Sequence, residues 1–305
     1  MVFSAPLPSP VPARVTDASS NVDANGDRLG DRPGDASAAR LAVNGAGGRM
    51  GRQLVAAIAE RADARLVAAA DAPGNDAVGQ DAGTLAGTGA AGVPVSDDIG
   101  ESLDGVDVVI DFTTPAATLA LLERLAGTGA RAVLGATGMT PEERARVEAT
   151  ARTMPVCFAA NYSAGVTLAL DLLEQAARAL DEDYDIEVVE AHHRHKVDAP
   201  SGTALVMGEA LARGRGRVLG DVAVYAREGI TGERERGRIG FATVRGGDIV
   251  GEHGVMFIGA GERLEITHRA HERMTFARGA VRAAIWLRNR GPGLYDMRDV
   301  LGLGL

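Results

Sequence analysis

Short apolar runs alternate with amphipathic stretches through the first half of the chain, beginning at Leu41. Brief apolar runs predict strands, and apolar positions that recur every three or four residues predict helices. The predicted strands are 41–44, 65–70, 106–111, 132–134 and 156–159, and the predicted helices are 49–61, 116–125 and 141–152. Because parallel neighbours need a crossover connection, strands separated by helices favour a parallel sheet. We therefore expect an α/β fold in this half.

The second half begins with a long helix, predicted over 165–180, after which the pattern changes. Strands are predicted at 186–191, 222–227, 240–245, 255–258 and 264–267, one helix at 202–212, and a last helix at 276–288 that closes the chain. Consecutive strands joined by glycine-rich turns are typical of an antiparallel or mixed sheet covered on one face by helices. We therefore expect a second, α+β domain with a mixed sheet.

Residues 1–39 differ from the rest of the sequence. They are rich in proline, aspartate and serine and show no apolar periodicity. Such a segment buries too little apolar surface to offset the entropy lost on ordering. We expect a disordered extension, and a start codon assigned too far upstream explains it equally well.

The composition argues against several classes of protein. A formal net charge of −9, without a basic stripe, argues against binding to nucleic acid. The single cysteine, Cys157, cannot form an internal disulfide and fits a reducing compartment, and its place in a predicted strand favours a core residue over a nucleophile. No apolar run approaches the length of a membrane-spanning helix. We expect a cytoplasmic protein that binds neither nucleic acid nor membrane.

A glycine-rich segment, Gly45–Gly51 (GAGGRMG), lies between the first predicted strand and the first predicted helix. Glycines there permit a tight turn and let backbone N–H groups approach a pyrophosphate at the positive end of the helix. Asp71 ends the second strand, 20 residues after Gly51, where a carboxylate can accept hydrogen bonds from a ribose. The motif departs from the usual spacing at Met50, so a plain tight turn, with Asp71 as a capping or loop aspartate, is the alternative.

Three further loops follow predicted strands of the parallel set, at 111–115, 135–138 and 159–162. Each alone is more often a turn. In an open α/β sheet, however, the carboxyl ends of the strands line the ligand crevice, so together these loops define one edge that could hold the rest of a dinucleotide.

The densest group of titratable residues is Glu190–Thr203 (EAHHRHKVDAPSGT). Ser201 can cap a helix that starts near Gly202, whose free N–H groups would face an anion. Lys196 is the only lysine among 32 basic residues, and a lysine, unlike an arginine, can give up a proton. The segment predicts an acid–base pair beside a carboxylate-binding helix end.

Two plainer readings compete with this one. His192, His193 and His195 could bind a metal, but neighbours along an extended stretch point to opposite faces, so we expect no metal site. A solvated polar loop is the other alternative. The remaining histidines are isolated in the sequence and are expected to be structural or surface groups: His253, His268 and His271.

From about Leu41 to its C-terminus the chain resembles the 4-hydroxy-tetrahydrodipicolinate reductase (dihydrodipicolinate reductase) family of the diaminopimelate route to lysine. The resemblance rests on Gly45–Gly51, Glu190–Thr203, Arg245–His253 and Gly261–His268. It implies that hydride from NAD(P)H reduces a cyclic dicarboxylate after water is lost. It also implies a Rossmann-like dinucleotide-binding domain at 40–162 and 273–305, with substrate binding and oligomerisation, usually as a homotetramer, at 163–272.

The resemblance also assigns roles to individual residues. His192 is the implied acid–base residue, Lys196 the implied proton donor, and His193, Gly202 and Thr203 are implied to hold the substrate carboxylates. The implied cofactor contacts are Gly45, Ala46, Gly47, Gly48, Arg49, Met50, Asp71, Gly135, Ala136, Thr137, Ala159, Ala160, Asn161 and Tyr162.

Two residues depart from the pattern of many relatives. Ala72 follows Asp71 where an arginine often pairs with the 2′-phosphate of NADPH, so we expect NADH to serve at least as well as NADPH, with Arg49 the obvious local cation. Ala136 stands where a threonine is common, which puts only a side-chain contact in doubt. Two other functions stay open: a dehydrogenase of another small dicarboxylate or amino-acid semialdehyde, and a nicotinamide-sensing binding protein without turnover.

Overall fold

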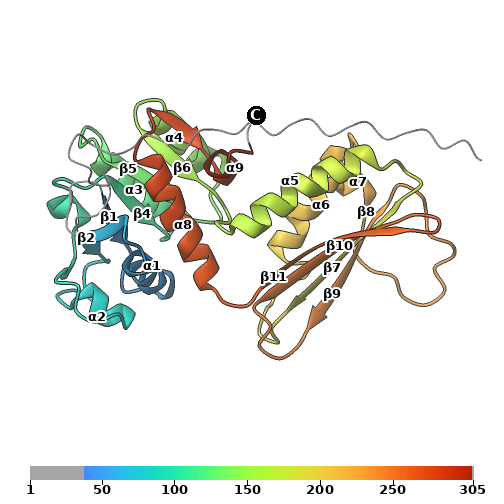
Figure 1. Cartoon of the computed structure of the whole chain (residues 1–305), viewed down its shortest axis with the longest axis horizontal. Coiled ribbons are helices and arrows are strands. Elements are labelled where there is room, and N and C mark those ends of the chain that lie inside the picture. Colours follow the sequence, from blue (N-terminus) through green and yellow to red (C-terminus); the bar gives the residue numbers. More distant parts are fainter. Residues whose placement is uncertain (1–37, 304–305) are drawn as a thin grey trace, which may run out of the picture. The chain divides into compact units, whose positions relative to one another are not determined.

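The structure is a computed structural model that describes residues 38–303. Within these residues the strands form two separate sheets, and helices pack on each (Figure 1). Most of the predicted extension at 1–39 lies outside the described residues, but Ala39 already begins the first strand. In the described part of the chain, no helix is both long and apolar enough to cross a membrane.

The first sheet is parallel throughout residues 38–303 and has the order β12-β6-β5-β4-β1-β2-β3. Its strands are β1 (Ala39–Asn44), β2 (Ala64–Ala70), β3 (Val95–Ser96), β4 (Val108–Asp111), β5 (Arg131–Leu134), β6 (Pro155–Phe158) and β12 (Gly293–Tyr295). The order reverses between β1 and β4, and this is the position at which doubly wound sheets bind dinucleotides. The predicted Rossmann-like parallel sheet is confirmed.

Helices cover both faces of this sheet, which explains why its strands are continuous apolar runs. The helices are α1 (Arg49–Ala59), α2 (Ala82–Ala86), α3 (Pro115–Leu125), α4 (Pro141–Ala151), α8 (Met274–Leu287) and α9 (Met297–Leu301), with the 3₁₀ turn η1 (Ile99–Ser102). On one face α1 and α8 bury Leu54, Ile58 and Val281 against β1 and β4. On the other face α3 and α4 bury Leu122 and Val147.

The second sheet is mixed, in the order β11-β10-β7-β9-β8. Its strands are β7 (Asp185–His192), β8 (Ala223–Val224), β9 (Ile239–Arg245), β10 (Gly251–Ile258) and β11 (Arg263–Ala270). The central strand β7 pairs antiparallel with β10 and parallel with β9. Helices α5 (Ala164–Ala179) and α6 (Gly202–Gly214) contact each other and cover one face of the sheet, where Leu173, Met207 and Phe257 form the core (Figure 1).

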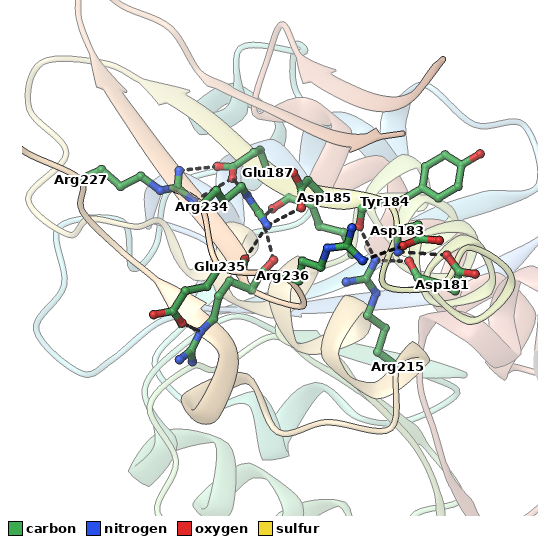
Figure 2. A network of polar contacts seen from close by, with 12 residues as sticks. Asp181, Asp183, Tyr184, Asp185, Glu187, Arg215, Arg227, Arg234, Glu235 and Arg236 are labelled. Carbon is green, nitrogen blue, oxygen red and sulfur yellow. Dashed lines mark hydrogen bonds and ion pairs between the residues drawn. The ribbon is translucent and has the colours of Figure 1, made fainter. Parts of the chain in front are cut away.

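Two predictions about the second half were wrong. The strand predicted at 222–227 is the short helix α7 (Leu219–Val222) followed by the two-residue strand β8, because the chain then leaves the sheet. From Tyr225 to Arg238 it runs as a loop tied to the start of β7 by arginine–carboxylate contacts (Figure 2). The helix at 276–288 does not close the chain, because β12 and α9 follow it and β12 pairs with β6.

Candidate active site

The end of β7 and the start of α6 place the predicted acid–base residues. Burial alternates along β7, as expected for a strand with one covered face, and puts Glu190 and His192 on the buried side. Glu190 is 1% exposed and His192 is 8% exposed. His192 Nδ1 lies 2.6 Å from Glu190 Oε2, so the imidazole of His192 is oriented by a buried carboxylate.

Ser201 caps α6, as the sequence predicted. Its Oγ accepts a hydrogen bond from the N–H of Ala204 at 3.1 Å and lies 2.9 Å from Nε2 of His253. Gly202 and Thr203 form the first positions of the helix, whose first turn carries no acidic residue. Backbone N–H groups in the first turn of a helix lack intrahelical partners and favour an anion. This helix end can therefore bind a substrate carboxylate.

The carboxylate of Glu190 accepts hydrogen bonds from several directions. Besides His192, its donors are the N–H of Ser201 at 3.0 Å, Thr243 Oγ1 at 3.2 Å, and both terminal nitrogens of Arg245 at 2.8 Å each. Burial by itself would raise the pKa of Glu190, but the hydrogen bonds from Arg245, His192 and Ser201 outweigh it and lower the pKa to about 2. Glu190 is therefore ionised at neutral pH.

Lys196 lies in the loop between β7 and α6. Its Nζ pairs with Asp198 Oδ1 at 2.8 Å, and its side chain is 21% exposed. The carbonyl oxygen of Asp198 accepts a hydrogen bond from Arg245 Nη2 at 2.6 Å. The arginine that holds Glu190 thus also holds the loop that carries the single lysine.

His193 occupies a different environment from His192. Its backbone N–H donates to the carbonyl of Ile249, and within the described residues its buried Nδ1 has no hydrogen-bond partner. Burial lowers the pKa of His193, and the positive charge of Arg273 lowers it further. A neutral imidazole with an open ring nitrogen can bond to an incoming polar group.

The two histidines on β10 and β11, predicted to be structural or surface groups, are buried (His253) and partly buried (His268), and they are not isolated in the fold. His253 and His268 are directly paired across these strands. The ring centroid of His253 lies 5.0 Å from that of His192, and burial lowers its pKa to about 4. Nε2 of His268 lies 3.3 Å from Oγ of Ser163, the cap of α5. His271 is exposed, as expected for a surface group.

The glycine-rich loop turns tightly and packs closely against the start of α1. Gly45 has a φ of +77°, and a Cβ on Gly51 would lie 2.0 Å from the carbonyl oxygen of Gly45, so the loop and α1 approach too closely for side chains. Gly48 is the N-cap of α1, and Arg49 and Met50 begin the helix. The helix end is open to an anion, and these residues fit a dinucleotide.

Asp71 lies beside this loop at the end of β2. One oxygen of its carboxylate accepts a hydrogen bond from the N–H of Gly47 at 2.7 Å, and the other from the N–H of Ala72 at 2.8 Å. Asp71 therefore holds the glycine-rich loop in place. Arg49 is exposed at the start of α1.

The other predicted cofactor residues follow β5 and β6. Gly135 and Ala136 come directly after β5, and a Cβ on Gly135 would overlap the ring of Phe112. Tyr162 is 1% exposed, and its hydroxyl donates to the carbonyl of Leu134 at 2.8 Å. Its ring belongs to the core, so any cofactor contact from Tyr162 must come from its backbone. Cys157 is a core residue, as predicted, and burial raises its pKa to about 12.

One cavity is lined by some residues of both predicted sets, but not by the glycine-rich loop, Asp71, Gly135, Ala136, Tyr162 or His193. It has a volume of about 910 Å³. Its walls include Thr137, Ala159, Ala160 and Asn161 from the loops after β5 and β6, with His192 at the end of β7, Lys196 in the loop that follows, and Gly202 and Thr203 at the start of α6. Residues 294–299, from β12 and α9, complete the wall. The sequence analysis missed this last segment because it did not predict either element. Loops at the carboxyl edge of the parallel sheet thus share a cavity with the predicted acid–base pair.

Comparisons with known proteins identify the family. A model described as "Dihydrodipicolinate reductase, N-terminus" matches residues 39–162, and one described as "Dihydrodipicolinate reductase, C-terminus" matches residues 165–301. The chain belongs to the dihydrodipicolinate reductase family. The two matches meet between β6 and α5 and cover both sheets.

Similar members of the dihydrodipicolinate reductase family carry the name 4-hydroxy-tetrahydrodipicolinate reductase. One from Alkalilimnicola ehrlichii is 58% identical over 264 residues, which is 87% of this chain and 99% of that protein. One from Acinetobacter baumannii is 56% identical over 268 residues, which is 88% of this chain and 98% of that protein. The family assignment therefore rests on nearly the whole length of these relatives.

Solved structures support the same fold. A dipicolinate-bound dihydrodipicolinate reductase from Paenisporosarcina sp. TG-14 is 24% identical with a TM-score of 0.68, and the match covers 85% of this chain and 97% of that one. An amine dehydrogenase from Mycobacterium smegmatis is 16% identical with a TM-score of 0.54, covering 85% and 95%. At these identities the likeness shows the shared fold.

Proposed function

We propose that the chain reduces 4-hydroxy-tetrahydrodipicolinate to tetrahydrodipicolinate with NAD(P)H and loss of water, in the diaminopimelate route of lysine biosynthesis. Membership of the family and the names of its 56–58% identical relatives support this function. The observation that carries it is the shared cavity, in which His192, Lys196 and the start of α6 face loops from the carboxyl edge of a dinucleotide-binding sheet.

The residues around α6 bind and orient the dicarboxylate. The N–H groups of Gly202 and Thr203 receive one substrate carboxylate at the positive end of the helix, with His193 as a further contact. Lys196 supplies a compact positive charge at the same cavity. This local cluster lets an acidic protein attract an anionic substrate.

Lys196 and His192 handle protons. When bound, the reduced nicotinamide supplies the hydride, and the ring nitrogen of the substrate then needs a proton. Lys196 is the proposed donor, and its ion pair with Asp198 holds the ammonium in position. His192 is the proposed acid–base partner, oriented through its Nδ1 by Glu190. A cation matched to charge that develops during the reaction stabilises the transition state more than the ground state.

The proposed cofactor contacts are the glycine-rich loop with Asp71 and the loops after β5 and β6. The Asp71 carboxylate, followed by Ala72, favours the free 2′-hydroxyl of NADH and repels the 2′-phosphate of NADPH. We therefore propose that NADH serves at least as well as NADPH. Arg49 is the exposed cation in this loop that can offset the repulsion.

The proposed domains follow the two sheets. Residues 40–162 and 273–305 form the dinucleotide-binding domain, because β12 joins the first sheet and α8 packs on α1. Residues 163–272 form the substrate-binding domain, which we also propose as the site of assembly into a homotetramer. We propose a cytoplasmic location, where the biosynthetic substrates and cofactor occur.

A coupled assay tests the function and the cofactor together. The substrate is generated from pyruvate and aspartate semialdehyde by the preceding enzyme, and oxidation of NADH and NADPH is followed for the wild type and for Lys196→Met. We expect the variant to lose roughly 10²-fold or more in turnover while staying folded, because the proton donor is gone. Arg194→Met, which removes an exposed cation two residues away, is the matched control and should retain activity.

Three results would each overturn one of these assignments. Near wild-type turnover by folded Lys196→Met contradicts the role of the lysine, and a clear preference for NADPH in kcat/KM contradicts the cofactor proposal. No turnover of this substrate by the wild type, with activity on another small dicarboxylate, would favour a different dehydrogenase.

A further inference from the structure

The carboxylate of Glu190 accepts hydrogen bonds from several parts of the site, although it is too deeply buried to act on a substrate itself. Within residues 38–303, five hydrogen-bond donors converge on its two carboxylate oxygens: the ring of His192, the backbone N–H of Ser201, the hydroxyl of Thr243 and two nitrogens of Arg245. These donors come from β7, from the cap of α6 and from β9. Such convergence holds separate elements in one fixed arrangement.

The charge of Glu190 decides which atom of His192 carries the proton. An ionised carboxylate has only acceptors, and the guanidinium of Arg245, bound to both oxygens, keeps Glu190 ionised despite its burial. A neutral imidazole beside it must therefore place its hydrogen on Nδ1 and leave Nε2 bare. Nε2 is then the nitrogen that can exchange a proton with the substrate.

The same carboxylate also fixes the anion-binding helix end. The N–H of Ser201 donates to Glu190 Oε1 at 3.0 Å, and Ser201 is the residue from which α6 begins. Arg245 extends the connection to the carbonyl of Asp198, whose carboxylate pairs with Lys196. One buried group thus connects the acid–base histidine, the lysine loop and the helix N-terminus.

We propose that Glu190, with Arg245 as its counter-ion, is a positioning residue that imposes the Nδ1–H tautomer on His192 and sets the place of the α6 N-terminus relative to it. The proposal deepens the proposed function, because it names what orients the groups of the same site. Glu190 acts through His192 and Ser201 and does not touch the substrate.

The test variant is Glu190→Gln, which keeps the size of the side chain and removes its charge. The glutamine amide can turn its NH₂ towards His192 and donate to Nδ1, which favours the opposite tautomer, with the hydrogen on Nε2. The tautomer is read from the ¹⁵N chemical shifts of protein labelled with [¹⁵N]histidine, in alkaline solution. The His192 signals are those missing from His192→Gln.

We expect bare Nε2 and protonated Nδ1 in the wild type, and loss of this state in Glu190→Gln. The turnover of the variant should fall roughly 10²-fold or more, while its KM for the cofactor stays within about twofold. Glu190→Asp keeps the charge and should recover part of the turnover with the wild-type tautomer. A merely structural role would lower the melting temperature without moving the tautomer.

Glu187→Gln is the matched control. Glu187 lies on the same strand and is also held by two arginines, Arg227 and Arg234, but on the other face of the sheet. This variant should keep the tautomer and the turnover of the wild type.

The outcomes separate the two proposals. A His192 tautomer with the hydrogen on Nε2 in the wild type would overturn the positioning role, and this outcome does not depend on whether Glu190→Gln folds. In folded Glu190→Gln, an unchanged tautomer would overturn it as well. The spectra are recorded without substrate. A tautomer that changes as expected in a wild-type protein that cannot reduce 4-hydroxy-tetrahydrodipicolinate would instead reject the proposed function and keep the role of Glu190.

Discussion

Strand β7 presents one arginine-bound glutamate on each face of its sheet, and the two differ in what else they hold. Glu187 accepts hydrogen bonds from Arg227 and Arg234, which lie in the loop between β8 and β9 (Figure 2). Glu190 accepts from Arg245 but also from an imidazole and from the cap of a helix. The same pairing of charges therefore holds a loop on one face and the proposed acid–base histidine on the other.

The difference lies in the partners and in the exposure to water. The side chain of Glu187 is 16% exposed, and Arg227 opposite it is 38% exposed. Burial by itself would raise the pKa of Glu187, but Arg227 and Arg234 outweigh it and lower the pKa. Two arginines share the carboxylate of Glu187, so either can be lost without leaving it unpaired.

Glu190, by contrast, is 1% exposed, and Arg245 is its arginine partner, bound at both oxygens. Loss of one arginine beside Glu187 should therefore cost little stability, whereas loss of Arg245 should cost much, because it leaves a buried carboxylate without its counter-ion.

The largest effect on stability is expected from Arg245→Met. The variant leaves the Glu190 carboxylate buried without its counter-ion, and removing one partner of a buried pair typically costs about 3–5 kcal/mol. Urea unfolding at pH 7 measures the loss. A loss below about 1 kcal/mol would contradict the idea that Arg245 keeps Glu190 ionised.

The second prediction concerns the stability of the protein in acid and depends on His253, which is buried beside His192. Burial lowers the pKa of His253 from 6.5 to about 4, so the folded protein binds fewer protons than the unfolded chain between these values. The stability that depends on neutral His253 is complete above pH 6.5 and is lost as the pH falls towards 4. The expected loss is about 3 kcal/mol over this range.

The control for the acid prediction is His253→Gln. Glutamine keeps a polar contact to Ser201 Oγ without a group that titrates in this range. Its free energy of unfolding should change less between pH 7 and pH 4 than that of the wild type. An equal change in both proteins would show that other groups, such as carboxylates, account for the acid sensitivity.

The sequence predicted those parts of the site that depend on local signals. Ser201 precedes an apolar helical pattern, and the structure confirms it as the cap of α6. The parallel sheet followed from strands that alternate with helices. The glycine-rich loop followed from the spacing of its glycines, since both the turn at Gly45 and the close approach at Gly51 exclude side chains.

The remaining parts depend on contacts between distant residues. β12 has three residues and becomes a strand only because β6 offers it a free edge, so no periodicity could predict it. Arg245 meets Glu190 from 55 positions away, and only the parallel pairing of β7 with β9 places them together. His253 seemed isolated for the same reason, because its neighbours His192 and Ser201 come from other elements.

The smallest effect is expected from Arg227→Met, on the other face of β7. Arg227 pairs with Glu187 through both terminal nitrogens, but Arg234 Nε also lies 3.0 Å from Glu187 Oε1, so we expect the carboxylate to stay paired in the variant. Partly exposed ion pairs contribute about 0–1 kcal/mol, so the free energy of unfolding should fall by less than about 1 kcal/mol, with unchanged turnover. The measurement is the urea titration used for Arg245→Met. A loss of stability as large as that of Arg245→Met would show that a second arginine does not compensate for the loss of the first. The two faces of β7 would then differ only in the contacts that Glu190 makes with His192 and with the cap of α6.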